Sequence, residues 1–301
     1  MLIEYNATYW ILPHYVDSLM TKSNGPYVGM ENLNVSGYEE AFIHRSIEKR
    51  IQDINWVGTE SYWLELENNE VERNHFLKSL QVSYSEFFRN PLTFAVLEKL
   101  VLPELIQQAV RNKHNKLRIW SMACASGQEV YSLAMLLEEY LEIESNPIQY
   151  SIVASDQSKS EIEQSKKGFY SYSALGNVSL KRLDRWFTKK NEGYQIKDEL
   201  RERIDFSVFN VVSDARGCPP ESVFGDFDLI ISANILFYYK PEYQKIILDK
   251  AGKALSKGGY LVTGEVERPI LLHHLFKEIY PFSAVFHKID LIYPLHEQKI
   301  F

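Results

Sequence analysis

The sequence predicts an α/β protein built on a doubly wound parallel sheet, with a smaller helical region ahead of it. Short apolar runs over 117–123, 148–155, 227–233 and 260–265 alternate with amphipathic segments of helical length, the order typical of strands joined by crossover helices. The length of 301 residues accommodates one large domain and a small companion. Hydrophobic residues make up 45% and charged residues 24% of the chain, which excludes a disordered or low-complexity protein.

The N-terminal region differs in pattern from the rest. Residues 1–30 are aromatic-rich and interrupted by Pro and Gly, which predicts an irregular extension. Over 31–82 we expect a helical region, because apolar residues recur at steps near 3.6, among them Phe42, Ile43, Ile47, Ile51 and Ile54. Residues 1–80 hold six Lys and Arg against twelve Asp and Glu, a net charge of −6, and their basic cluster is Arg45, Lys49 and Arg50.

The elements of the sheet follow in order. Asn90-Pro91 predicts a helix start, with Asn as the cap and Pro at the first helical position. The first apolar run leads through a short polar loop into an amphipathic helix over 129–141. The second run ends at Asp156, and a polar helix is expected over 158–167.

The C-terminal half repeats this alternation. A helix over 241–255 follows the third run, and Gly258-Gly259 is expected to turn the chain into the last one. Residues 169–203 are too long for a plain connection and too polar for a core helix. We therefore expect an inserted subdomain there.

The composition of the chain limits the classes of partner, cofactor and compartment that we expect. A net charge of −7 counts against an enzyme that wraps nucleic acid. No apolar run approaches the roughly 20 residues of a membrane span, and the N-terminus has no signal-peptide pattern. We therefore expect no membrane insertion. Two cysteines, Cys124 and Cys218, fit a reducing cytoplasm, and the eight histidines show no metal-ligand spacing, so no metal is expected.

The loop after the first run lies at the topological switch point of a doubly wound sheet, where ligands bind. Its small residues Ala123, Ala125 and Gly127 let the backbone approach a ligand closely, and Ser126 is placed to satisfy N–H groups at the helix start. One glycine in place of G-x-G-x-x-G disfavours a dinucleotide dehydrogenase. Glu129 repels phosphate and suits a ligand ammonium; the alternative interpretation is a favourable charge on the helix dipole.

Asp156 is placed to accept both ribose hydroxyls of a nucleoside. The alternative interpretation is an N-cap for the helix that starts near Ser158. Two acids, few glycines and no P-loop lysine indicate a nucleoside without phosphate. S-adenosylmethionine (SAM) fits, because its ammonium needs an anion and its ribose an acid. Asn234 follows the third run at the same sheet edge, with Tyr238 and Tyr239 close behind, and packing is the interpretation favoured for Tyr239.

At four places in order the sequence resembles the CheR-type chemotaxis receptor methyltransferases, SAM-dependent enzymes that methylate glutamate side chains of chemoreceptors. The matching segments are SYSEFFRNP (83–91), WSMACASGQEVYSLAM (120–135), FDLIISANILFYY (227–239) and GGYLVTGEVE (258–267). The resemblance covers about residues 35–300. It implies a class I SAM-dependent methyltransferase domain with a Rossmann-like sheet over 83–301, a small helical domain over 31–82, and an inserted β-subdomain at about 169–203.

The resemblance also implies the site and the reaction. SAM contacts would fall on Ser83, Ser85, Arg89, Glu129, Asp156, Asn210, Val211, Asn234 and Ile235, and the catalytic residues would be Arg89 and Tyr238. The methyl of SAM would pass to glutamates of a chemoreceptor-like protein, leaving S-adenosylhomocysteine. A glutamate has a reference pKa of about 4.3, so it is ionised near pH 7 and needs no general base. Arg89 is placed to hold its carboxylate, and an ion pair with Glu86 is the alternative.

Several residues depart from the family pattern. Ala233 stands in place of an Arg, and Glu265 in place of a His. The inserted region has Gly176 and Gly193 but no Gly-x-Gly, the element that goes with binding a receptor's C-terminal pentapeptide, so this chain looks pentapeptide-independent. Two alternatives stay open: a SAM-binding sensor or docking module with weak catalysis, and a methyltransferase for a different acceptor.

Overall fold

The computed structural model describes residues 35–81, 84–112, 116–144, 148–222, 225–272 and 274–289. The extension expected over 1–30 and the site residue Ser83 lie outside the described residues.

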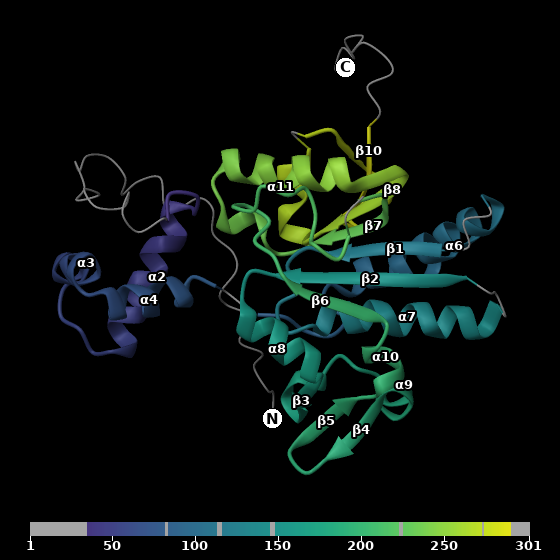
Figure 1. The fold of residues 1–301 in the computed structure, drawn as a ribbon, viewed down its shortest axis with the longest axis horizontal. Coiled ribbons are helices and arrows are strands. Elements are labelled where there is room, and N and C mark those ends of the chain that lie inside the picture. The colour runs from purple at the N-terminus through teal and green to yellow at the C-terminus, as the bar shows by residue number, and fades with distance from the viewer. Residues whose placement is uncertain are drawn as a thin grey trace, which may run out of the picture.

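A seven-stranded sheet forms the centre of the molecule (Figure 1), with strand order β6-β2-β1-β7-β8-β10-β9. From β1, the chain winds outward through β2 and β6 on one side and through β7 and β8 on the other, so the predicted doubly wound parallel sheet is confirmed. At the far edge of the described sheet, β10 runs antiparallel to both β8 and β9. The strands are β1 (Lys116–Ser121), β2 (Gln149–Asp156), β6 (Ile204–Val208), β7 (Phe227–Ser232), β8 (Leu255–Thr263), β9 (Phe276–Glu278) and β10 (Val285–Lys288).

Each face of the sheet has its own apolar core, because successive strand residues point to opposite faces. Ile119 joins a core with α6 and α7, whereas its neighbour Trp120 joins a core with α11 on the other face. The helices of the domain are α5 (Pro91–Val96), a π-helical turn (Leu97–Val101), α6 (Leu102–Arg111), α7 (Gln128–Glu144), α8 (Lys159–Lys167), α11 (Pro241–Ala254) and α12 (Arg268–Leu271).

Ahead of the sheet lie α2 (Glu40–Asp53), α3 (Thr59–Asn68) and α4 (Glu70–Ser79), which share a separate core. The 3.6-residue pattern of α2 places Phe42, Ile43 and Ile47 in that core. The guanidinium of Arg50 donates to both carboxylate oxygens of Glu72 at 2.8 and 2.9 Å. Arg50 is therefore ion-paired with α4, and its side chain remains 23% exposed.

A second, antiparallel sheet lies between α8 and β6 in the chain and projects from the main body below α7 (Figure 1). Its strands are β3 (Phe169–Ser171), β4 (Phe187–Lys190) and β5 (Gly193–Ile196), in the order β3-β5-β4. Helices α9 (Leu180–Trp186) and α10 (Asp198–Arg201) accompany it. We call residues 169–201 the insertion.

Two local predictions were wrong. Helix α5 begins at Pro91 as predicted, but Asn90 makes no side-chain cap, because its backbone is left-handed with φ 59°. Gly258 and Gly259 do not form a turn before the run over 260–265 but lie within β8, where the register to β7 shifts. Gly258 has φ +80°, so the bulge uses glycine there.

The insertion provides a matched pair of glycines for a stability test. A Cβ at Gly193 would collide with the carbonyl oxygen of Tyr170 on the neighbouring strand, whereas a Cβ at Gly176 would meet nothing within 4 Å. We expect Gly193→Ala to lower the free energy of unfolding by about 1–3 kcal/mol. Gly176→Ala should leave it unchanged or slightly raised. Urea unfolding followed by circular dichroism measures both, and equal midpoints would contradict this account of the insertion.

Candidate active site

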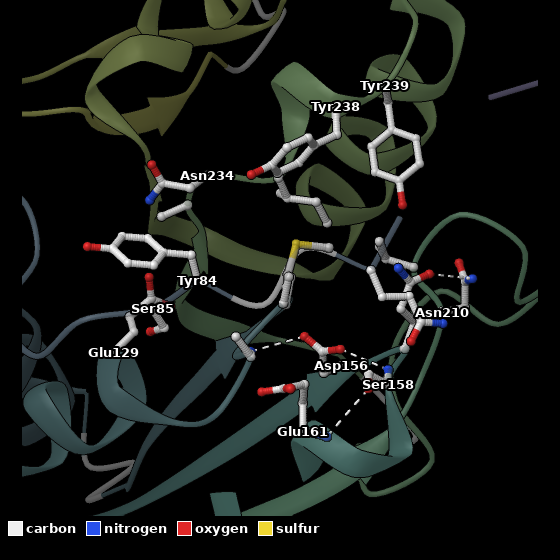
Figure 2. Close-up of a pocket in the computed structure, with 18 of the residues that line it drawn as sticks. Tyr84, Ser85, Glu129, Asp156, Ser158, Glu161, Asn210, Asn234, Tyr238 and Tyr239 are labelled. Carbon is white, nitrogen blue, oxygen red and sulfur yellow. Dashed lines mark hydrogen bonds between the residues drawn. The ribbon is translucent and has the colours of Figure 1, made fainter. Parts of the chain in front are cut away.

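A pocket opens at the carboxyl ends of β1, β2 and β7, enclosing about 900 Å³ including its open mouth. Parallel neighbours end at the same sheet edge, so residues far apart in the sequence meet here. The pocket is lined by every site residue named from the sequence that the structure describes: Ser85, Arg89, Glu129, Asp156, Asn210, Val211, Asn234, Ile235 and Tyr238. In Figure 2, Ser85 and Glu129 lie at one end, Asn210 lies at the other, and Tyr238 lies above them.

The loop between β1 and α7 forms the floor. Ala125 has φ 45° and Gly127 has φ +93°, so the backbone turns sharply here. A Cβ at Gly127 would lie 3.1 Å from Ser165 and from the hydroxyl oxygen of Tyr170. The Ser126 hydroxyl donates to the side-chain oxygen of Gln128 at 2.9 Å rather than accepting from an N–H group at the start of α7. Glycine is therefore required at 127 by both conformation and space.

Asp156 joins the end of β2 to this floor. Its Oδ2 accepts from the N–H of Ala125 at 3.0 Å and its Oδ1 from the N–H of Ser158 at 2.8 Å. The N-cap of α8 is Ser158, whose hydroxyl accepts from the N–H of Glu161, so the capping alternative for Asp156 is wrong. Burial raises the pKa of Asp156. A carboxylate has about four acceptor positions, so two remain for a ligand.

Glu129 lies in the first turn of α7 and faces the pocket. The hydroxyl of Ser121 donates to its Oε1 at 3.0 Å. Burial raises the pKa of Glu129 to about 7, while the Ser121 bond and the nearby Arg89 oppose that rise and Glu267 adds to it. A cationic ligand group here would favour the ionised carboxylate.

Glu267 is a site residue that the sequence reasoning missed. Its buried carboxylate accepts from the N–H groups of Asn234 at 2.8 Å and Leu236 at 2.6 Å. It also accepts from the Thr263 hydroxyl and the Gly264 N–H at 2.7 and 2.8 Å. Asn234 has φ 61°, and these bonds hold that turn at the end of β7. The signal was present in the sequence, because Glu267 ends the GGYLVTGEVE segment.

Arg89 reaches the pocket from the loop before α5. Its guanidinium lies 5.1 Å from the ring centre of Tyr84 and donates to the Tyr84 carbonyl at 3.3 Å. Glu86 instead accepts from the Tyr84 hydroxyl. Within the described part of the chain, Arg89 forms no ion pair within 4.0 Å, so the predicted alternative partner Glu86 does not hold it.

The helical region completes the mouth. Tyr38 stacks on Tyr239 with ring centres 4.9 Å apart, and Phe42 lies 4.9 Å from Tyr238. The N–H of Glu39 donates to the Tyr238 carbonyl at 2.9 Å. Tyr239 is buried, in agreement with the packing interpretation, although it also borders the pocket. Burial raises the pKa of Tyr238.

At the far end, Asn210 follows β6. Its amide nitrogen donates to the Gln157 side chain at 3.1 Å, and its oxygen accepts from the N–H of Val212 at 2.9 Å and of Ser213 at 3.0 Å.

Among the described residues no group of three or more His, Cys, Asp or Glu is arranged to hold a metal. Burial raises the pKa of the Cys124 thiol, which fits a small filler. No helix in the described ranges is long and apolar enough to cross a membrane.

Residues 83–280 match the family model described as CheR methyltransferase, SAM binding domain. The chain belongs to the CheR methyltransferase family. It is a SAM-dependent methyltransferase, and SAM is its cofactor. As a CheR-family member it matches chemotaxis protein methyltransferase 1 of Pseudomonas aeruginosa at 34% identity, over 65% of this chain and 69% of the relative.

Two further relatives differ in length. The chemotaxis protein methyltransferase of Listeria monocytogenes is 29% identical, over 78% of this chain and 84% of its own. An uncharacterised 104.1 kDa protein of Rhodobacter capsulatus is 31% identical over 78% of this chain, which spans only 24% of that larger protein.

The raised pKa of Glu129 predicts a pH-dependent cost to stability. The unfolded carboxyl ionises near pH 4.3 and the folded one near 7, so the folded state loses stability as pH rises between these values. We expect Glu129→Gln to stabilise the cofactor-free protein by about 1–3 kcal/mol at pH 8, and hardly at all at pH 4.5. Thermal unfolding at both pH values measures this. The exposed Glu163→Gln is the control, and the same response from both variants would contradict the prediction.

Proposed function

We propose that this CheR-family enzyme transfers the methyl of SAM to glutamate side chains of a chemoreceptor-like protein. The observation that carries the proposal is the charge pattern of the pocket. Glu129 supplies an anion at one end and Asp156 supplies free acceptor positions towards the other (Figure 2). A sulfonium nucleoside with an ammonium group and a ribose diol matches this pair, whereas a phosphate would be repelled.

The residue roles follow from this fit. Asp156 accepts the ribose hydroxyls while still holding Ala125, and Glu129 binds the ammonium in its ionised form. Asn210 and Val211 border the base end of the pocket, and Ser85, Asn234 and Ile235 complete the walls. Ser83 keeps the same proposed role from the sequence alone.

Methyl transfer then depends on orientation. SAM supplies an electrophilic methyl on a sulfonium, so the protein needs no general base for an acceptor carboxylate that is already ionised. Arg89, which has no carboxylate partner among the described residues, holds one acceptor oxygen through its planar guanidinium. Tyr238 shapes the methyl position and donates its hydroxyl to the acceptor. Phe42 packs beside Tyr238, Tyr38 stacks on the neighbouring Tyr239, and the two pairs keep water away.

The acceptor and its location are part of the same proposal. A chemoreceptor presents its methylated glutamates in the cytoplasm, so we place the enzyme there. The insertion lacks a Gly-x-Gly, and Gly193 is fixed by its contact with β3, so we propose recognition without a C-terminal pentapeptide. The helical region over 31–82 acts as the acceptor-facing domain and 83–301 as the catalytic one.

Methyl-labelled SAM incubated with the full chain and a purified chemoreceptor cytoplasmic fragment tests the proposal. We expect label in base-labile esters on glutamates, located by mass spectrometry. Binding of SAM without transfer to any protein would favour a sensor or docking module. Label on another molecule in a lysate, with none on the receptor fragment, would favour a different acceptor.

Arg89→Ala separates substrate orientation from cofactor binding. We expect kcat for methyl transfer to fall about a hundredfold, since a misplaced reactant costs rate of that order. The Kd for SAM, measured by calorimetry, should rise far less. Arg89→Lys keeps the charge but loses the fork, so its kcat should lie between the two. Equal losses in kcat and SAM affinity would make Arg89 a cofactor residue only.

A further inference from the structure

The loop that carries Arg89 has an unfavourable backbone conformation on both sides of that residue. Phe88 has φ 50° and Asn90 has φ 59°, so the residues on both sides of Arg89 are left-handed. This conformation is unfavourable for a residue other than glycine. Contacts from outside the loop must therefore fix the direction in which Arg89 points.

The first of these contacts holds Phe87. Its ring is fully buried and meets two aromatic rings of the insertion edge-on. Tyr170 of β3 lies 4.9 Å away and Phe187, the first residue of β4, lies 5.6 Å away, measured between ring centres. Edge-to-face pairs of this kind favour one relative orientation. The insertion thus fixes the residue two positions before Arg89.

The second contact holds Phe88. The guanidinium of Arg182, on α9 of the insertion, lies 4.5 Å from the centre of its ring, and Phe94 packs against it at 5.4 Å. Arg182 is itself fixed, because it donates to both carboxylate oxygens of Glu139 at 2.9 to 3.1 Å. Trp186 donates to the same carboxylate at 3.1 Å. Because the Arg182 guanidinium is fixed by Glu139, its cation–π contact restrains the ring of Phe88.

The same insertion reaches the cofactor loop. The Tyr170 hydroxyl donates to the Ser126 carbonyl at 2.6 Å, in the loop between β1 and α7. Tyr170 therefore contacts the floor of the SAM pocket with its hydroxyl and the Arg89 loop with its ring. Strand β3 of the insertion thus supports both the loop that lines the SAM pocket and the loop that carries Arg89.

We propose that the insertion is a positioning element for methyl transfer, in which Arg182, Tyr170 and Phe187 set the Arg89 loop against the cofactor. Arg182 does not line the SAM pocket, and it reaches the Arg89 loop through the ring of Phe88. Its guanidinium also lies 3.5 Å from the carboxylate of Glu98, just after α5. The catalytic part of this inference rests on the proposed role of Arg89, whereas the structural part does not.

A matched pair of arginines tests the inference in the full-length protein. Arg182 and Arg185 lie one turn apart on α9, and both pair with α7, through Glu139 and Glu142 respectively. Arg185 stacks on Trp186 rather than on the Arg89 loop. Arg182→Ala and Arg185→Ala are compared by hydrogen exchange of the 84–94 segment, by SAM affinity, and by kcat and KM with labelled SAM and the receptor fragment.

We expect Arg182→Ala to speed exchange of the 84–94 segment about tenfold and to lower kcat about tenfold, with SAM affinity within twofold of wild type. Arg182→Lys, which keeps a cation near Phe88, should recover part of kcat. Arg185→Ala should match wild type in all three measurements. If Arg182→Ala does not fold, Phe187→Leu carries the same expectation.

Equal exchange and equal kcat in the two alanine variants would overturn the inference. A wild-type protein that methylates no receptor fragment would overturn the proposed function instead. In that case the exchange comparison still decides whether the insertion holds the loop.

Discussion

Two buried carboxylates hold the loops from which the pocket is built. Asp156 accepts from the N–H of Ala125 after β1, and Glu267 accepts from the N–H of Asn234 after β7. Both held residues are non-glycine residues with positive φ, 45° and 61°. Such strain persists only where surrounding contacts outweigh it. The N–H donors in turn offset the cost of burying each carboxylate, so the loops are shaped before any ligand arrives.

Two other charged groups of the site have few hydrogen-bond or ion-pair partners among the described residues. Among the described residues Glu129 accepts one hydrogen bond, from Ser121, and burial raises its pKa to about 7. Arg89 lies against Tyr84 without a carboxylate partner in the described structure. Groups of this kind reduce stability but leave binding capacity for ligand, a trade-off common at active sites. The helical region packs beside the site through the contact of Phe42 with Tyr238. The insertion packs beside it through the contact of Tyr170 with Phe87.

The parallel core was predictable because short apolar runs alternate with amphipathic helices, and strands such as β7 are buried on both faces. Three strands of the central sheet were not predicted: β6 has polar residues among its apolar ones, and β9 and β10 have only three and four residues. Glu129, Asp156 and Asn234 were predictable from their places near strand ends. The other pocket-lining residues, Ser85, Arg89, Asn210, Val211 and Ile235, followed only from the resemblance to the CheR family. Glu267 did not, because its role depends on a turn after β8 that folds back onto the end of β7, a long-range contact without local pattern.

In the proposed binding mode, Asp156 binds the ribose of SAM and Glu129 binds its ammonium group. A crystal structure of the protein with S-adenosylhomocysteine measures this directly. We expect both ribose hydroxyls within about 3 Å of the Asp156 carboxylate and the ammonium at the same distance from Glu129, with the Ala125 bond intact. A ligand whose ribose contacts neither oxygen of Asp156, or whose ammonium lies away from Glu129, would contradict the account.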